Sequence, residues 1–332
     1  MNNVLALKQM ITGYWTSQAI YVAAKLELAD KLASGPKSVA ELAKATSTDE
    51  GALFRMLRAL SSVGVFTQQA DGKFALSPLA DPLRKNAEDS QWAMAVMMGE
   101  EHFSAWGELL YSIQTGQGSF RKVYGEGVFD YLGKHPEQAA VFDAAMTSIH
   151  GKETALMADA YDFSQFGTLC DVGGGNGSTI ATILQRNPKL KGVLFDLPHV
   201  VERAKPNLSA AGVLARCELV SGSFFEQVNV TADAIMMRHI IHDWDDAKCI
   251  TILKNCRAAI GPNGKVLVVE SVVPTGNEPG FVKWLDLTML VIPEGKERTE
   301  SEYRELFAAA GLKLQRVVHT AGELDILEAV PA

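Results

Sequence analysis

Long apolar runs are missing from this chain of 332 residues, and so is the pattern of a secretion signal. No stretch reaches the roughly 18 apolar residues that a membrane-spanning helix requires. The first ten residues lack the basic and then apolar order of a signal peptide. We therefore expect a cytoplasmic protein that has no membrane partner.

An excess of basic residues is also missing, and cysteines are few. The chain has 31 Lys and Arg against 39 Asp and Glu, a net charge of −8, which disfavours a nucleic-acid partner. Its four cysteines are not spaced in pairs like those of zinc sites, so we expect reduced thiols in a cytosolic protein. The hydrophobic content of 47% is ordinary for a globular protein. A small-molecule substrate is favoured.

Residues 1–90 are predicted to form a winged-helix module. Ser38 and Glu41 have the spacing of a capping box, an amphipathic leucine helix follows, and Asp71 and Gly72 suit a hairpin turn. A winged helix can bind DNA, but these 90 residues hold ten Lys and Arg against nine Asp and Glu. This near neutrality favours packing or dimerisation.

Residues 91–160 are predicted to be a helical connector that is rich in methionine and aromatic residues. Such side chains form either a helical core or subunit interface, or the adaptable wall of a pocket for a flat ligand. For any single residue we favour the core. Met146 and His150 are the candidates for contact with a substrate.

Residues 161–332 alternate between strand-like and helical stretches, which predicts an α/β fold with a mostly parallel sheet. Strand-like runs occur at 169–172, 192–196, 217–221, 234–238, 265–270, 313–319 and 324–329. Gly322 separates the last two runs, so we expect them to form an antiparallel hairpin. This long second part is where a ligand site is expected.

A glycine-rich turn follows the first of these strands, at 171–177 (Asp-Val-Gly-Gly-Gly-Asn-Gly). Asp196 ends the second strand, where a carboxylate can bind both hydroxyls of a ribose. The turn has one residue fewer than the pattern of NAD-binding proteins, and Asp171 would repel a pyrophosphate. S-adenosylmethionine, which carries an ammonium and a sulfonium, is therefore favoured over NAD, and a turn that binds nothing is a weaker reading.

His242 follows the fourth strand, at the sheet edge where ligands bind in such folds. With an ordinary pKa near 6.5 it could accept a proton from a phenol. Alternatively, His239 and His242 could bind a metal with Asp243, Asp245 and Asp246, or His242 could be structural. The last two acids also suit the start of a helix. A catalytic base is favoured.

Two acids are candidates to orient that histidine. Glu270 ends the fifth strand after four apolar residues, which is an unusual place for a surface acid. Glu297 lies in the segment 295–299 (Gly-Lys-Glu-Arg-Thr), where a solvated loop is an alternative interpretation. We therefore favour Glu270 as the orienting acid, and at this point both interpretations of Glu297 stay open.

The sequence resembles the caffeate- and hydroxyindole-type O-methyltransferases and their bacterial relatives. The resemblance rests on the segments 171–177, 195–199 (Phe-Asp-Leu-Pro-His), 242–244 (His-Asp-Trp) and 295–299. It implies a C-terminal Rossmann-like methyltransferase domain, an N-terminal all-α or winged-helix dimerisation domain, and no metal. It also implies a homodimer in which the N-terminal helices of each subunit reach into the partner's pocket.

The resemblance further implies roles for individual residues. It predicts a catalytic group in which His242 is the base and is flanked by Glu270 and Glu297. Ser223 stands where the family usually has Asp, and Arg238 where it usually has Lys. The expected cofactor contacts are Asp171, Gly173, Gly175, Asp196, Leu197, Ser223, Phe224 and Arg238. The expected substrate contacts are Met146, His150, Trp284, Asp286 and Met289.

The leading hypothesis is an O-methyltransferase that transfers a methyl group from S-adenosylmethionine to a phenolic hydroxyl of an aromatic secondary metabolite. The alternatives are a winged-helix regulator that senses a ligand without turnover, a relative that has diverged to a reaction other than methylation, and an NAD-linked oxidoreductase.

Overall fold

A computed structural model describes residues 3–332, apart from the side chains of residues 149–152. The chain forms two compact units. The first contains the chain up to Gly107 and also Asp130–Ile149, and the second contains Glu108–Phe129 and His150–Ala332. Helices α10 (Val128–Lys134) and α11 (Pro136–Ala160) therefore have residues in both units. The three-part division that we predicted, with breaks near residues 90 and 160, stays a prediction.

The first unit is helical with one small hairpin. Its remaining helices are α1 (Asn3–Ile11), α2 (Gly13–Lys25), α3 (Leu28–Leu32), α4 (Val39–Thr46), α5 (Glu50–Ser62), α6 (Trp92–Gly99) and α7 (Glu101–Trp106). Strands β1 (Phe66–Gln68) and β2 (Phe74–Leu76) pair antiparallel after α5. The predicted order of helices followed by a hairpin is confirmed.

Local signals explain why these helices begin where they do. The Ser38 side chain accepts a hydrogen bond from the Glu41 amide, and the Glu41 side chain accepts one from the Ser38 amide, so the capping box is confirmed. Leu53, Leu57 and Leu60 of α5 are all buried. They pack in one core with residues of α3, α4 and the hairpin, which supports the amphipathic interpretation.

The second unit is built on a seven-stranded sheet with the order β5-β4-β3-β6-β7-β9-β8. Its first five strands in the chain pair parallel, whereas β9 is antiparallel to both β7 and β8, as predicted. The strands are β3 (Thr168–Val172), β4 (Lys191–Asp196), β5 (Cys217–Ser221), β6 (Ala232–Arg238), β7 (Ile260–Glu270), β8 (Leu312–His319) and β9 (Asp325–Pro331).

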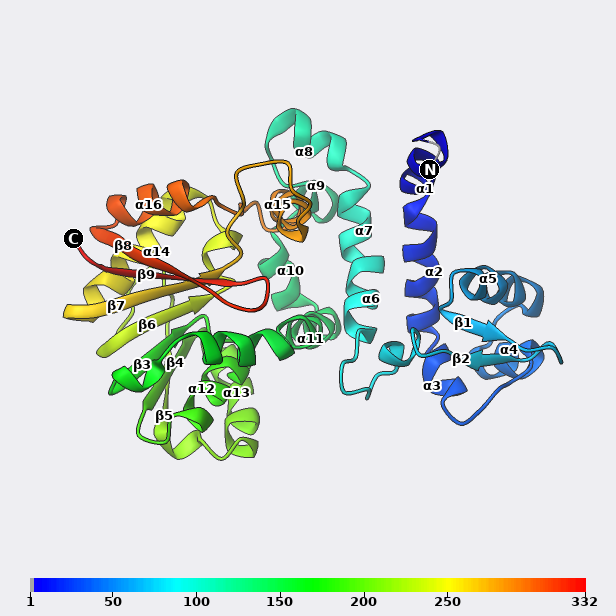
Figure 1. Cartoon of the computed structure of the whole chain (residues 1–332), viewed down its shortest axis with the longest axis horizontal. Helices are drawn as coiled ribbons and strands as arrows, with labels where there is room; N and C mark the ends of the chain where they lie inside the picture. The colour runs from blue at the N-terminus through cyan, green and yellow to red at the C-terminus, as the bar shows by residue number, and fades with distance from the viewer. Residues whose placement is uncertain (1–2) are drawn as a thin grey trace. The chain divides into compact units, whose positions relative to one another are not determined.

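Helices cover both faces of this sheet (Figure 1). Alternate residues of one strand pack on opposite faces: Cys170 lies in the core with α14 and α16, and Leu169 in the core with α12 and α13. The helices of this unit are α8 (Leu109–Thr115), α9 (Ser119–Tyr124), α12 (Ser178–Arg186), α13 (Pro198–Ala210), α14 (Asp246–Ala259), α15 (Phe281–Val291) and α16 (Glu300–Ala309).

One strand boundary differs from the prediction by more than two residues. Strand β7 begins at Ile260, five residues before the predicted start at Lys265. Ile260 pairs with Ala232, and the register then shifts before Lys265 pairs with Ala234. The intervening segment contains two glycines and a proline, so its sequence predicts a loop.

Two expectations about the whole chain can be compared with the structure. All four cysteines are free, as expected, and all four are also buried. Within residues 3–332, no helix is both long enough and apolar enough to span a bilayer.

Candidate functional site

The candidate residues gather at one edge of the second unit's sheet. Asp171 lies near the end of β3, and Asp196, Arg238 and Glu270 are the last residues of β4, β6 and β7. These four strands are parallel, so their carboxyl ends meet at the same edge.

The glycine-rich turn has a backbone that only glycine adopts easily. Gly173, Gly175 and Gly177 all have positive φ angles, of 72°, 57° and 78°. A Cβ atom on Gly173 would collide with the side chain of Ile240, whereas one on Gly175 would meet no atom within 4 Å. The turn therefore lies against Ile240 on one side and is open at Gly175.

Asp196 holds this turn in place. Its carboxylate accepts hydrogen bonds from the amides of Gly175, at 2.9 Å, and Leu197, at 2.7 Å. An ionised carboxylate has about four acceptor positions, so these bonds leave capacity for ribose hydroxyls. The side chain of Leu197 is 46% exposed beside it. The ribose-binding role of Asp196 stays a prediction.

Asp171 is a buried acid with an unused oxygen. It is 2% exposed, and its Oδ2 atom has no hydrogen-bond partner among the described residues. Burial raises the pKa of Asp171 to about 7, although the positive charge of Arg238 acts in the opposite direction. A cation beside Asp171 would stabilise its ionised form. The site therefore fits a ligand with an ammonium or sulfonium group.

Arg238 is the buried basic residue of this edge. Its guanidinium donates to the hydroxyls of Thr154, at 2.5 Å, and Thr179, at 3.3 Å, and to the carboxylate of Glu153, at 3.3 Å. These residues belong to α11 and α12, so Arg238 links both helices to the end of β6. A contact of Arg238 with a cofactor stays a prediction.

Ser223 and Phe224 lie after β5, next to the glycine turn. The Ser223 hydroxyl accepts a hydrogen bond from the amide of Phe225 at 3.3 Å. The ring of Phe224 packs edge-on against Phe225, with centroids 4.8 Å apart, and is 6.3 Å from the ring of Trp244. An atom of the Phe224 ring also lies 3.9 Å from where a Gly173 Cβ would stand. An aromatic surface therefore flanks the turn.

His242 lies in a short 3-10 turn, η4 (Ile241–Asp243), between β6 and α14. Its Nδ1 atom is 2.6 Å from Oε1 of Glu297 and 3.4 Å from Oε2 of Glu270. Glu270 is fully buried, and its Oε1 atom accepts hydrogen bonds from the amides of Ile240 and Ile241, both at 3.0 Å. The structure thus brings together the three residues that we predicted as the catalytic group.

The charges around His242 correct one assumption of the sequence analysis. Burial lowers the pKa of His242, but the charges of Glu270 and Asp243 and the hydrogen bond to Glu297 outweigh burial and raise the pKa to about 10. The imidazole is therefore protonated at neutral pH in the ligand-free protein, contrary to the ordinary pKa near 6.5. The pKa of Glu270 is raised to about 7, mainly by burial.

Asp243 belongs to this cluster, although we did not include it in the predicted catalytic group. Its Oδ1 atom is 3.6 Å from Nε2 of His242, and burial raises its pKa to about 6. The position directly after His242 in a tight turn was the available signal. His239 is also close, with its ring centroid 5.0 Å from that of His242. Its φ angle of 52° is left-handed, which is uncommon for a residue with a side chain.

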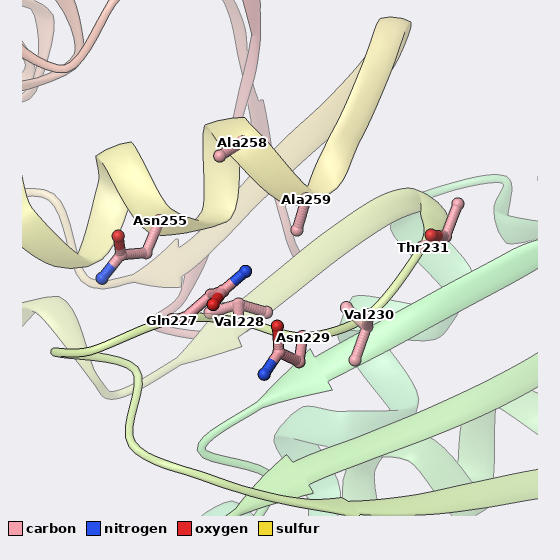
Figure 2. A pocket seen from close by; sticks show the side chains of 8 residues that line it. All are labelled: Gln227, Val228, Asn229, Val230, Thr231, Asn255, Ala258 and Ala259. Carbon is pink, nitrogen blue, oxygen red and sulfur yellow. The ribbon is translucent and has the colours of Figure 1, made fainter.

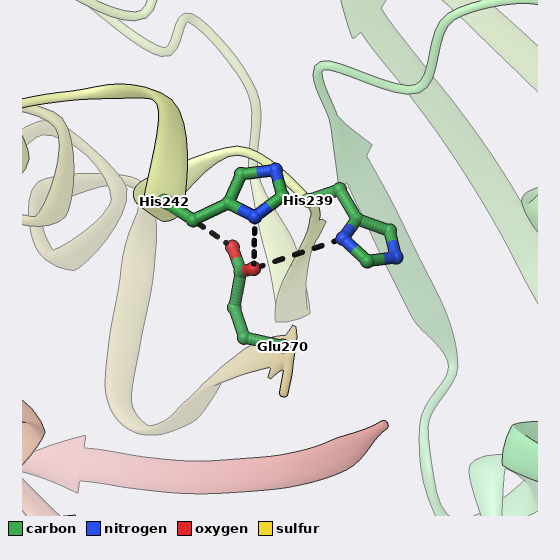
Figure 3. Close-up of side chains that lie close together, drawn as sticks. All are labelled: His239, His242 and Glu270. Atoms are coloured by element: carbon green, nitrogen blue, oxygen red, sulfur yellow. Dashed lines mark hydrogen bonds and ion pairs between the residues drawn. The ribbon is translucent and has the colours of Figure 1, made fainter. Parts of the chain in front are cut away.

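Figure 3 shows three residues that bear on the alternative hypothesis of a metal site. His239, His242 and Glu270 offer ligand atoms that all lie within 4.8 Å of one another. However, Nδ1 of His242 is already hydrogen-bonded to Glu297. Asp245 is the N-cap of α14, where it accepts a hydrogen bond from the Lys248 amide. The contacts favour a group of ion pairs over a metal centre.

The predicted substrate contacts lie in different parts of the chain. On α15, Trp284 is 65% exposed, Met289 is buried, and Asp286 accepts a hydrogen bond from the Glu297 amide at 2.9 Å. Met146 belongs to the first unit, where it packs against a small core that includes Met97. The side chain of His150 lies outside the described residues. The substrate roles of all five residues stay predictions.

A hollow elsewhere in the second unit is not part of this site. It is lined by residues such as Gln227, Asn229 and Asn255, and by Thr231, which directly precedes β6 (Figure 2). It therefore opens at the amino end of β6, whereas His242 follows the carboxyl end of the same strand.

Comparisons with known proteins match both parts of the chain. Residues 106–313 match an O-methyltransferase domain, and residues 8–86 match an O-methyltransferase dimerisation domain. The phenazine O-methyltransferase of Lysobacter antibioticus is 46% identical over 98% of this chain and 95% of that protein. The mitomycin biosynthesis 6-O-methyltransferase of Streptomyces lavendulae is 34% identical over 97% of this chain and 93% of that protein.

The solved structures that this chain resembles also include O-methyltransferases. An O-methyltransferase from neocarzinostatin biosynthesis, in complex with S-adenosylmethionine and 2-hydroxy-5-methyl naphthoic acid, superposes with a TM-score of 0.87. It is 32% identical, and the match covers 96% of each chain.

Proposed function

The chain belongs to the O-methyltransferase family and is a methyltransferase that uses S-adenosylmethionine; from this membership we propose that it methylates a phenolic hydroxyl of a fused-ring aromatic metabolite. His242 is the general base in this proposal. Glu270 and Glu297 orient its imidazole. Supporting observations are the aromatic acceptors and products named for the relatives, among them a phenazine and a naphthoic acid.

The observation that carries the mechanism is the 2.6 Å hydrogen bond between Nδ1 of His242 and Glu297. In the neutral imidazole, Nδ1 keeps its proton and donates it to Glu297, so Nε2 is the ring nitrogen that can accept a proton. In the proposed reaction Nε2 takes the proton of the phenolic hydroxyl, and the oxygen keeps the electron pair of the broken O–H bond. Bound S-adenosylmethionine would supply the electrophilic methyl group, with the electron pair of the broken S–CH3 bond staying on the sulfur of the product S-adenosylhomocysteine.

The cofactor residues have separate proposed tasks. Asp171 faces the cationic end of the cofactor, Gly173 and Gly175 let its methionine part approach the backbone, and Asp196 binds the ribose. The remaining proposed contacts are Leu197, Ser223, Phe224 and Arg238. Because Ser223 is short and uncharged, the adenine depends more on the rings of Phe224 and Trp244 than on a hydrogen bond.

The test is the substitution His242→Gln. We expect kcat to fall about 10²-fold or more, because general base catalysis typically contributes 10²–10⁴-fold. The dissociation constant of S-adenosylhomocysteine, measured by calorimetry, should remain unchanged. A panel of hydroxyphenazines, hydroxynaphthoates and simple phenols identifies the acceptor for these assays.

The matched control is His319→Gln, because His319 is exposed and its ring is hydrogen-bonded to the Asp325 side chain of the neighbouring strand β9. It should leave kcat unchanged. Full activity of His242→Gln would contradict the base, and cofactor binding without methyl transfer to any acceptor would contradict the enzyme proposal in favour of a ligand sensor.

We also infer that the protein is a homodimer through its first unit. Seven large apolar residues of α1 and α2 are more than half exposed: Val4, Leu5, Leu7, Met10, Ile11, Tyr14 and Trp15. We call these residues the N-terminal stripe. An exposed apolar group of this size is typical of an association surface, and it overlaps the segment that matches a dimerisation domain.

A further inference from the structure

We propose that Arg298 is the positioning residue that holds His242 at its distance from Glu297. This role rests on the proposed function of His242 as the general base. Arg298 is 1% exposed, and it directly follows Glu297 in the chain. It does not touch the reacting atoms, so its effect on the reaction would pass through His242.

The guanidinium binds backbone carbonyls on both sides of His242. Its Nη1 donates to the carbonyl of Ile241 at 3.1 Å, and its Nη2 donates to the carbonyl of Trp244 at 2.9 Å. Nη1 also donates to the carbonyl of Lys296 at 3.0 Å, in the segment that carries Glu297. One side chain therefore joins the turn that bears the base to the segment that bears its acid.

The position of the guanidinium is itself set by Asp246 in the first turn of α14. The Asp246 carboxylate accepts from Nε at 3.0 Å and from Nη2 at 2.7 Å. With three carbonyls and one carboxylate as partners, the planar group is bound along both of its edges. Such a buried arginine with several hydrogen bonds has little freedom to move. It can therefore fix the distance between the turn that bears His242 and the segment that bears Glu297.

The backbone of the same segment completes this attachment. The Lys296 amide donates to the carbonyl of His242 at 2.8 Å, and a Cβ atom on Gly295 would collide with that carbonyl. On the opposite side of the turn, Glu270 accepts from the amides of Ile240 and Ile241. The amides of the turn are thus bound by the Glu270 side chain of β7, and its carbonyls are bound by the 295–298 segment. Arg298 donates most of the hydrogen bonds to these carbonyls.

A lysine at this position would keep the charge but not the bonds. Its single ammonium cannot reach the carbonyls of Ile241, Trp244 and Lys296 in the geometry of a planar fork. The turn would then shift relative to Glu297. A displacement of about 1 Å in a catalytic group can lower a rate about 10²-fold.

The experiment compares Arg298→Lys with Arg304→Lys, whose arginine is exposed on α16 and paired with Glu300. For Arg298→Lys we expect kcat to fall about 10- to 100-fold, while the affinity for S-adenosylhomocysteine changes less than twofold. The low-field proton NMR signal of the His242–Glu297 hydrogen bond, assigned by its loss in His242→Gln, should move upfield. Arg304→Lys should change none of these properties.

A folded Arg298→Lys protein with unchanged kcat and an unchanged low-field signal would overturn the proposal. If Arg298→Lys does not fold, Asp246→Asn replaces it, because Asp246 is largely exposed and its loss only loosens the guanidinium. We then expect a smaller fall in kcat with a shift of the same signal, and no change in either would overturn the proposal. Full activity of His242→Gln would instead contradict the general base, so the two failures are distinguishable.

Discussion

His242 is surrounded by more negative charge than one imidazolium can balance. Glu297 and Glu270 lie on the Nδ1 side of the ring, at 2.6 and 3.4 Å, and Asp243 lies on the Nε2 side at 3.6 Å. This arrangement makes the imidazole a strong base. The same negative charges keep most of the imidazole protonated at neutral pH. General base catalysis depends on both properties, because only the neutral fraction accepts a proton.

The pH dependence of the rate should reflect this compromise. We expect kcat/KM to rise from pH 6 toward pH 9–10, because the pKa of His242 is raised to about 10 in the ligand-free protein. In Glu297→Gln the rise should move toward lower pH, because one of the acids that raises the pKa is removed. Using the same acceptor for both proteins cancels the ionisation of the phenol itself.

If the wild-type profile is already flat above pH 6, the imidazole is neutral at physiological pH and the charge argument is wrong. If Glu297→Gln shifts the profile toward higher pH, Glu297 is not the acid that stabilises the imidazolium.

Stability should respond to pH with a definite sign. A histidine whose pKa is higher in the folded than in the unfolded protein stabilises the fold below pH 6.5, and this contribution is lost as the pH rises to about 10. The raised pKa values of Glu270 and Asp243 act in the same direction at lower pH. The free energy of unfolding should therefore fall between pH 6.5 and pH 10.

Urea denaturation at these two pH values measures the effect. The wild type should lose at least about 1.4 kcal/mol more than His242→Gln, the equivalent of one pKa unit. His319→Gln should behave like the wild type. An equal loss in wild type and His242→Gln would show that other groups cause the decrease.

At the scale of elements, the glycine turn between β3 and α12 carries two different requirements. Gly173 and Gly175 both have left-handed backbones, but only at Gly173 would a side chain collide with Ile240. A left-handed conformation costs an ordinary residue roughly 1–2 kcal/mol, and overpacking costs typically a further 1–3 kcal/mol. The two positions therefore separate backbone strain from steric collision.

Gly173→Ala should be the more damaging of the two alanine substitutions. We expect about 2–5 kcal/mol of lost stability for Gly173→Ala and about 1–2 kcal/mol for Gly175→Ala. Binding of S-adenosylhomocysteine should weaken more for Gly173→Ala, since relief of the collision displaces the turn. Equal losses in both measurements would mean that the turn rearranges freely, contrary to its attachment to Asp196.

At the scale of the whole molecule, the N-terminal stripe predicts self-association. Trp15 and Met10 are 61% and 78% exposed within one subunit. Placing a charge there should be costly if a second copy covers the stripe, because a buried unpaired charge is strongly unfavourable. We expect Trp15→Glu combined with Met10→Glu to shift the mass in sedimentation velocity from dimer to monomer.

The control is Val63→Glu, because Val63 is also about half exposed but lies at the end of α5, outside the stripe. It should leave the dimer intact. A wild type that is monomeric at micromolar concentration, or a double variant that remains dimeric, would contradict the assignment of the stripe.

The sequence alone determined the features that depend on neighbours along the chain. The capping box of α4, the N-cap of α14 and the strands that alternate with helices follow from residues within a few positions of one another. The glycine turn with Asp171, and Asp196 at the end of the next strand, indicated the cofactor in the same way. Resemblance of four short segments then indicated the reaction.

Only the tertiary structure decided the state of the catalytic group. The pKa of His242 depends on Glu270 and Glu297, which lie 28 and 55 positions away in the chain, and no local pattern contains the distances between them. The attachment of Arg298 to the His242 turn was likewise invisible in the sequence. Burial and Coulomb energy are sums over residues that are close in space, and folding alone brings these residues together.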